Sequence, residues 1–108
     1  MDKIILDHFK KNDQKLYAII TKIGKMDKHL LKTSGDYFSD LCESIANQQL
    51  SGKAAATIWG RFIGLMGKRK ITPLLVLKVS EEKIRGVGMS WAKARYVRDL
   101  AQKVTDKL

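Results

Sequence analysis

The sequence is poor in cysteine, proline and acidic residues, and it has no long apolar run. Its single cysteine, Cys42, excludes an internal disulfide and a zinc site built from cysteines. No segment approaches the roughly 18 consecutive apolar residues of a membrane-spanning helix, and the charged first residues differ from a secretory signal. We therefore expect a soluble protein of the cytoplasm or nucleoid, nuclear in a eukaryote, with no membrane partner.

Strand patterns are also nearly absent. The β-branched residues do not alternate with polar ones, whereas apolar residues recur at helical spacing in most segments. The 108 residues, 44% of them apolar and 30% charged, suit one folded unit with a modest core. The sequence therefore predicts an all-α fold in a single α-helical domain covering residues 1–108.

Positive charge is what the sequence has in excess. The 21 lysines and arginines outnumber 11 acidic residues and leave a net charge of +10. Such a field raises the local concentration of polyanions, so nucleic acid is the leading partner. An anionic membrane surface would need a helix with a continuous apolar face opposite a basic one, and no single segment shows that pattern clearly.

Apolar spacing and capping residues together place the helices. The first runs roughly from Asp2 to Lys10, and a second begins after the cap Asp13, stops at Gly24 and leads into a basic linker. Later helices begin at small polar caps, with Pro73 in the first helical position after its cap. The predicted later caps are Asp36, Ser51, Thr72, Ser80 and Ser90.

The same patterns indicate where these helices end and which residues face inward. We predict that the Ser51 helix fades at Gly67, that the Thr72 helix ends at Leu77 and that the Ser80 helix stops at Gly86-Val87-Gly88. The inward residues predicted for the first helix are Ile4, Ile5, His8 and Phe9; for the Asp36 helix, Phe38, Leu41, Cys42 and Ile45; and for the last helix, Ala94, Val97, Leu100, Ala101 and Val104.

Two helix starts carry nearby cations and could contact phosphates. Ser51 is followed by Lys53, and Ser90 is followed by Lys93 and Arg95. The Gly86-Val87-Gly88 segment between two helices fits the tight turn of a helix-hairpin-helix, which offers N–H groups to a DNA phosphate. It fits a plain glycine helix stop equally well, and both interpretations stay open.

Residues for enzymatic chemistry do not converge in the sequence. The carboxylates read as helix caps or as residues on polar helix faces, and His8 and His29 are isolated from other ligands. We therefore predict no metal and no cofactor.

Two long motifs resemble the helix-hairpin-helix DNA glycosylase superfamily, closest to its alkylation-repair branch, DNA-3-methyladenine glycosylase II. They are I-x-x-Q-Q-L-S-x-K-A-A, here Ile45 to Ala55, and G-x-S-x-A-K-A-x-Y-x-R-D-L-A, here Gly88 to Ala101. The resemblance covers about Phe9 to Val104. It implies a multi-helix orthogonal bundle that binds the minor groove of damaged double-stranded DNA, bends it and extrudes a base.

The resemblance also implies roles for individual residues. A side chain must fill the gap that an extruded base leaves, and in the family this wedge lies in the turn that matches Asn47 to Ser51. By this alignment Gln49 is the wedge, with Ser51 nearby in the minor groove. The DNA-binding residues expected in this chain are Gln48, Gln49, Leu50, Ser51, Lys53, Gly86, Gly88, Ser90 and Lys93.

The chain departs from the family pattern in its catalytic part. In the family the segment matching Gly86 to Ala101 precedes the DNA-binding hairpin, and the catalytic aspartate follows that hairpin. Neither Asp99 nor Asp106 matches this aspartate, and the lysine nucleophile of the bifunctional branch is missing as well. We therefore expect the N-terminal portion of a glycosylase, with no catalytic residue and no activity of its own.

Two other interpretations stay open. The chain could be a stand-alone DNA-binding module that uses its basic surface without excision. It could also be a helical interaction module whose partner is a complementing C-terminal fragment or a second copy. The sequence does not identify the alkylated base.

Overall fold

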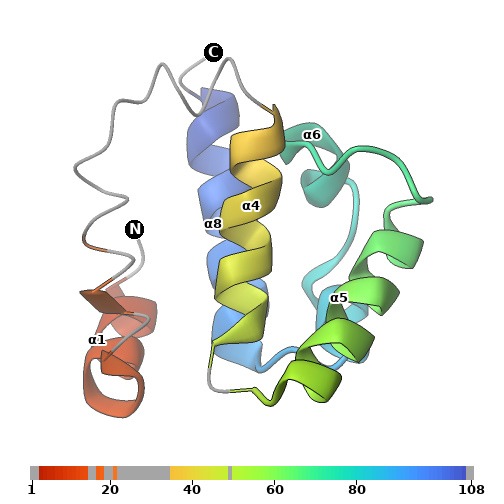
Figure 1. The fold of residues 1–108 in the computed structure, drawn as a ribbon. Helices are drawn as coiled ribbons and strands as arrows, with labels where there is room; N and C mark the ends of the chain where they lie inside the picture. The colour runs from red at the N-terminus through yellow and green to blue at the C-terminus, as the bar shows by residue number, and fades with distance from the viewer. Residues whose placement is uncertain (1–2, 15–16, 19–20, 22–34, 49, 107–108) are drawn as a thin grey trace.

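A computed structural model describes residues 3–14, 17–18, 21, 35–48 and 50–106 (Figure 1). In this part of the chain the secondary structure is helical and no strand occurs, which confirms the predicted fold class. None of the helices in these residues is long and apolar enough to span a membrane. The helices are α1 (Lys3–Asn12), α4 (Gly35–Asn47), α5 (Gly52–Leu65), α6 (Pro73–Leu77), α7 (Glu81–Gly86) and α8 (Trp91–Asp106).

Helix α8 lies at the centre of the fold. It packs against α1, α4, α6 and α7, and α4 runs beside it in the opposite direction (Figure 1). All five apolar residues predicted for its inner face are buried, and Ala92 and Tyr96 are buried as well. The buried face is wider than the predicted stripe because neighbouring helices cover α8 from more than one side.

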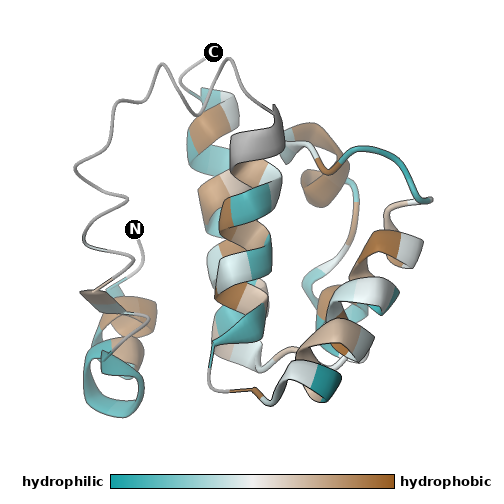
Figure 2. Ribbon diagram, viewed as in Figure 1, coloured by the Kyte–Doolittle hydropathy of each residue, from teal (hydrophilic) through white to brown (hydrophobic). Residues whose placement is uncertain are grey.

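The core forms where α1 and α4 meet α8, and α5 packs against α4. Phe9 of α1 makes an edge contact with Tyr96 of α8, with ring centroids 5.9 Å apart. Cys42 of α4 is fully buried, and burial raises the pKa of its thiol, so it is the small buried hydrophobe that its place in the helix predicts. Figure 2 shows α6 as largely apolar and the turn that precedes it as polar.

Capping residues predicted from the sequence start four of the helices. Each side-chain hydroxyl accepts a hydrogen bond from the backbone N–H three residues later, which satisfies one of the unpaired donors at the helix start. Pro73 follows its cap in the first turn of α6. The pairs are Ser51 with Ala54 (3.2 Å), Thr72 with Leu75 (3.3 Å), Ser80 with Lys83 (3.2 Å) and Ser90 with Lys93 (3.2 Å).

Several predicted boundaries and faces need correction. Helix α1 continues to Asn12 rather than ending near Lys10, and α4 begins at Gly35, before the Asp36 that was expected to cap it. Ile4 is 65% exposed although an inward position was predicted, because α1 contacts the core along one narrow face that Ile5 and Phe9 fill.

The predicted second helix falls largely outside the described residues, as do Gly24 and the basic linker. Its start is described: the N–H of Tyr17 donates to the carbonyl oxygen of Asp13 at 2.9 Å, the first bond of a helix that begins after Asp13. Asp13 itself is buried.

Candidate nucleic-acid interface

The connection between α4 and α5 is a tight turn. The N–H of Leu50 donates to the carbonyl of Asn47, the last residue of α4, at 3.2 Å, and Ser51 caps α5 directly afterwards. Gln48 and Leu50 are half-buried, whereas Ser51, Gly52 and Lys53 are exposed. Gln49 lies outside the described residues. We call the described residues of this connection, Gln48, Leu50 and Ser51, the α4–α5 turn.

The start of α5 has the electrostatic character of a phosphate site. A helix N-terminus carries partial positive charge, and the first turn of α5 contains no acidic residue to neutralise it. Lys53 is exposed in that first turn and adds a full positive charge. By contrast, α7 carries Glu81 and Glu82 in its first turn, so its start is electrostatically compensated.

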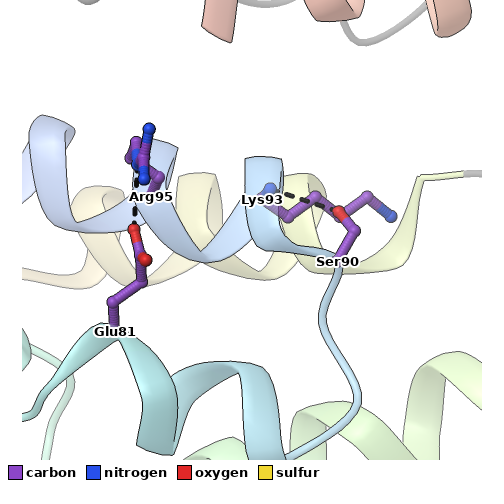
Figure 3. A network of polar contacts seen from close by, with 4 residues as sticks. All are labelled: Glu81, Ser90, Lys93 and Arg95. Carbon is purple, nitrogen blue, oxygen red and sulfur yellow. Dashed lines mark hydrogen bonds and ion pairs between the residues drawn. The ribbon is translucent and has the colours of Figure 1, made fainter.

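The start of α8 meets the end of α4. The ammonium of Lys93 donates to the carbonyl oxygen of Gln48 at 2.6 Å and to that of Ala46 at 3.3 Å. Figure 3 shows its side chain extending from the first turn of α8, beside the cap Ser90. The structure therefore brings together two of the predicted site residues, Gln48 and Lys93, through a backbone carbonyl.

Burial and a carboxylate act in opposite directions on this ammonium. Partial burial lowers the pKa of Lys93, and the negative charge of Asp13 opposes that effect. Lys93 thus contacts the end of α4 from α8, in the electrostatic field of Asp13.

The turn between α7 and α8 uses its N–H groups internally. The N–H of Val87 donates to the carbonyl of Ile84 at 3.2 Å, and that of Gly88 donates to the carbonyl of Arg85 at 2.9 Å. A phosphate-binding hairpin would turn such donors toward solvent. Of the two interpretations of Gly86-Val87-Gly88, this geometry favours the helix stop.

The sequence was compared with models of known protein families. A sequence model of the HhH-GPD superfamily base excision DNA repair proteins matches residues 42–107. The chain belongs to the HhH-GPD superfamily. No curated protein matches it at a significant level. The matched segment contains both the α4–α5 turn and α8, so every predicted DNA-binding residue of this superfamily member lies within it.

Arg95 of α8 connects this helix to α7. Its Nε donates to the Glu81 carboxylate at 3.0 Å (Figure 3). Its guanidinium lies 5.5 Å from the centre of the Trp91 ring. Because the ion pair is partly exposed, it contributes little to stability, but it engages the cation that sequence reasoning placed near a phosphate site. Within the described residues no cluster of three or more histidine, cysteine, aspartate or glutamate side chains could hold a metal.

Sequence reasoning missed the carbonyl acceptors of Ala46 and Gln48 and the charge of Asp13. The acceptors lie 47 and 45 residues before Lys93, and every residue has a carbonyl, so no local pattern could mark them.

Gly86 and Gly88 differ in the space available for a side chain, and a pair of alanine substitutions can test this difference. Gly88 has a φ of +118°, and a Cβ there would lie 2.9 Å from Cγ1 of Ile58, so we expect Gly88→Ala to lower the free energy of unfolding by about 2 kcal/mol. Gly86→Ala meets open space at the end of α7 and should leave stability unchanged or raise it by roughly 0.5 kcal/mol. Denaturant unfolding of both variants measures the difference, and equal effects would contradict this geometry.

Proposed function

We propose that this chain binds alkylated duplex DNA and extrudes the damaged base, as the DNA-binding part of a glycosylase of the DNA-3-methyladenine glycosylase II type. The observation that carries the proposal is the α4–α5 turn. It joins a Q-Q-L-S sequence to the basic, uncompensated start of α5, in a chain whose family acts in base excision repair.

Binding would begin with phosphate contacts. The net charge of +10 attracts DNA from a distance, and neutralising phosphates releases counterions. The exposed Ser51 and Lys53 would then hold a phosphate at the start of α5 through a hydroxyl, an ammonium and the helix N–H groups. These contacts position the turn on the duplex and carry no information about the base.

Extrusion would use the turn as a wedge. Removing a base from the stack costs a few kcal/mol, and a side chain that enters the gap recovers part of this cost. In the proposal Gln49 fills the gap, and its amide can hydrogen-bond to the base left without its partner. The neighbouring Leu50 adds apolar surface beside it.

The proposal assigns cleavage of the N-glycosidic bond to none of the described carboxylates. That step builds positive charge on the sugar, which a positioned carboxylate stabilises. Asp106 lies at the exposed end of α8, where it accepts a hydrogen bond from Gln102 at 2.7 Å. Asp13 is buried and acts electrostatically on Lys93.

The wedge can be tested with Gln49→Ala. We expect the affinity of the variant for duplex DNA to stay within about threefold of the wild-type value, because phosphate contacts supply most of the affinity. For both proteins the affinity should fall steeply as salt is added. The fraction of extruded base should fall about tenfold, the equivalent of about 1.4 kcal/mol. Fluorescence of 2-aminopurine in a mismatched duplex reports extrusion, and fluorescence anisotropy reports binding.

The matched control is Gln102→Ala, which removes a glutamine near the far end of α8. It should leave both signals unchanged. A wild-type chain that binds DNA without any rise in 2-aminopurine fluorescence would reject the wedge and leave a plain DNA-binding module.

The proposal places no catalytic aspartate within residues 1–108, and this can be tested separately. The 108-residue chain should release 3-methyladenine from alkylated DNA no faster than the uncatalysed background, because no carboxylate of the chain matches the family's catalytic position. Chromatography of the released bases measures this rate. Efficient release by the chain alone would show that another of its carboxylates performs the chemistry.

A further inference from the structure

The ammonium of Lys93 fastens the end of α4 at the point where the α4–α5 turn begins. A helix leaves its last carbonyl groups without partners, and these groups carry partial negative charge. Lys93 donates to the Ala46 carbonyl, inside that last turn, and to the Gln48 carbonyl, the first residue beyond the helix. One cation thus bridges the helix and the turn.

The side chain of Asn47, which lies between Ala46 and Gln48 in the sequence, does not duplicate this contact. The side-chain oxygen of Asn47, between the two carbonyl groups, is buried and accepts no hydrogen bond, so it does not compete for the ammonium. Beyond Gln48, the N–H of Leu50 bonds back to the Asn47 carbonyl at 3.2 Å. Among the described residues, the Leu50 hydrogen bond and the ammonium from α8 hold this connection.

The anchor itself is held rigidly. Lys93 lies in the first turn of α8, where its own N–H donates to the hydroxyl of Ser90 at 3.2 Å. On either side of it, Ala92 and Ala94 are fully buried, which fixes the orientation of the helix. The base of the Lys93 side chain cannot shift without moving the core.

We propose that Lys93 is a positioning residue for base extrusion: it fixes the end of α4 and Gln48, the point from which the chain leads into the proposed wedge. This inference rests on the proposed function, and it gives Lys93 a role other than direct contact with a phosphate. A pre-ordered turn loses less conformational entropy on binding, which favours the extruded state.

The substitution Lys93→Met tests this role because it keeps the length and apolar stem of the side chain and removes the ammonium. Its matched control is Lys103→Met, which removes an exposed charge from the last turn of the same helix. We expect exchange of the Leu50 amide hydrogen to accelerate about tenfold in Lys93→Met and to stay unchanged in Lys103→Met. The Val97 amide in the core of α8 reports global unfolding in both variants.

The second readout is 2-aminopurine fluorescence at saturating DNA, which a loss of affinity alone does not change. We expect Lys93→Met to lower it several-fold and Lys103→Met to leave it as in the wild type. Combining Lys93→Met with Gln49→Ala should add little to Gln49→Ala alone, because both changes act on the same wedge. If Lys93→Met does not fold, Lys93→Gln serves for the same measurements.

The outcomes separate the two proposals. Unchanged exchange at Leu50 in a folded Lys93→Met variant would overturn the anchoring role, whatever the DNA results. If exchange of the Leu50 amide is faster in Lys93→Met but its 2-aminopurine fluorescence at saturating DNA equals that of the wild type, the proposal is also overturned. Base extrusion would then not depend on the Lys93 contact. If the wild-type chain itself never unstacks 2-aminopurine, the proposed function fails, and the exchange of Leu50 alone decides whether Lys93 holds the turn.

Discussion

Burial of α8 is the constraint on which the arrangement of the other helices depends. Its inner residues include the fully buried Ala92, Tyr96 and Val97, and four other helices pack against it. The same helix carries cations that reach the ends of its neighbours: Lys93 donates to carbonyls at the end of α4, and Arg98 donates to the Leu77 carbonyl, at the end of α6, at 3.4 Å. Hydrophobic burial thus sets the position of α8. The polar side chains of α8 donate hydrogen bonds to carbonyl groups at the ends of neighbouring helices.

In the proposed function, the residues that hold the DNA are separate from those that would do chemistry on it. The exposed start of α5 supplies positive charge, and the α4–α5 turn beside it is anchored from within the protein. Neither part needs a reactive group. In the proposed function, affinity comes from the charged surface, while selectivity for a weakened base pair comes from the low cost of extruding it.

The features that the sequence predicts well are local ones. A cap such as Ser51 acts on a residue three positions later, so its pattern is complete within one helical turn. The inner face of α8 is predicted only in part, because burial of Ala92 and Tyr96 requires neighbours from distant segments. The acceptors of Lys93 lie more than forty residues away and bear no side-chain signature, so that contact appears only in three dimensions. For Gln49, the expected role comes from family resemblance alone.

Mapping the amides that respond to DNA tests the central claim most directly. Backbone NMR shifts would be followed while a duplex that contains an abasic-site analogue is titrated into the protein. The account predicts that the largest changes fall on Gln48, Leu50, Ser51 and Lys53, with smaller ones at the start of α8. Changes concentrated on the basic residues after α5, at Lys68 and Arg69, with none in the α4–α5 turn, would contradict it.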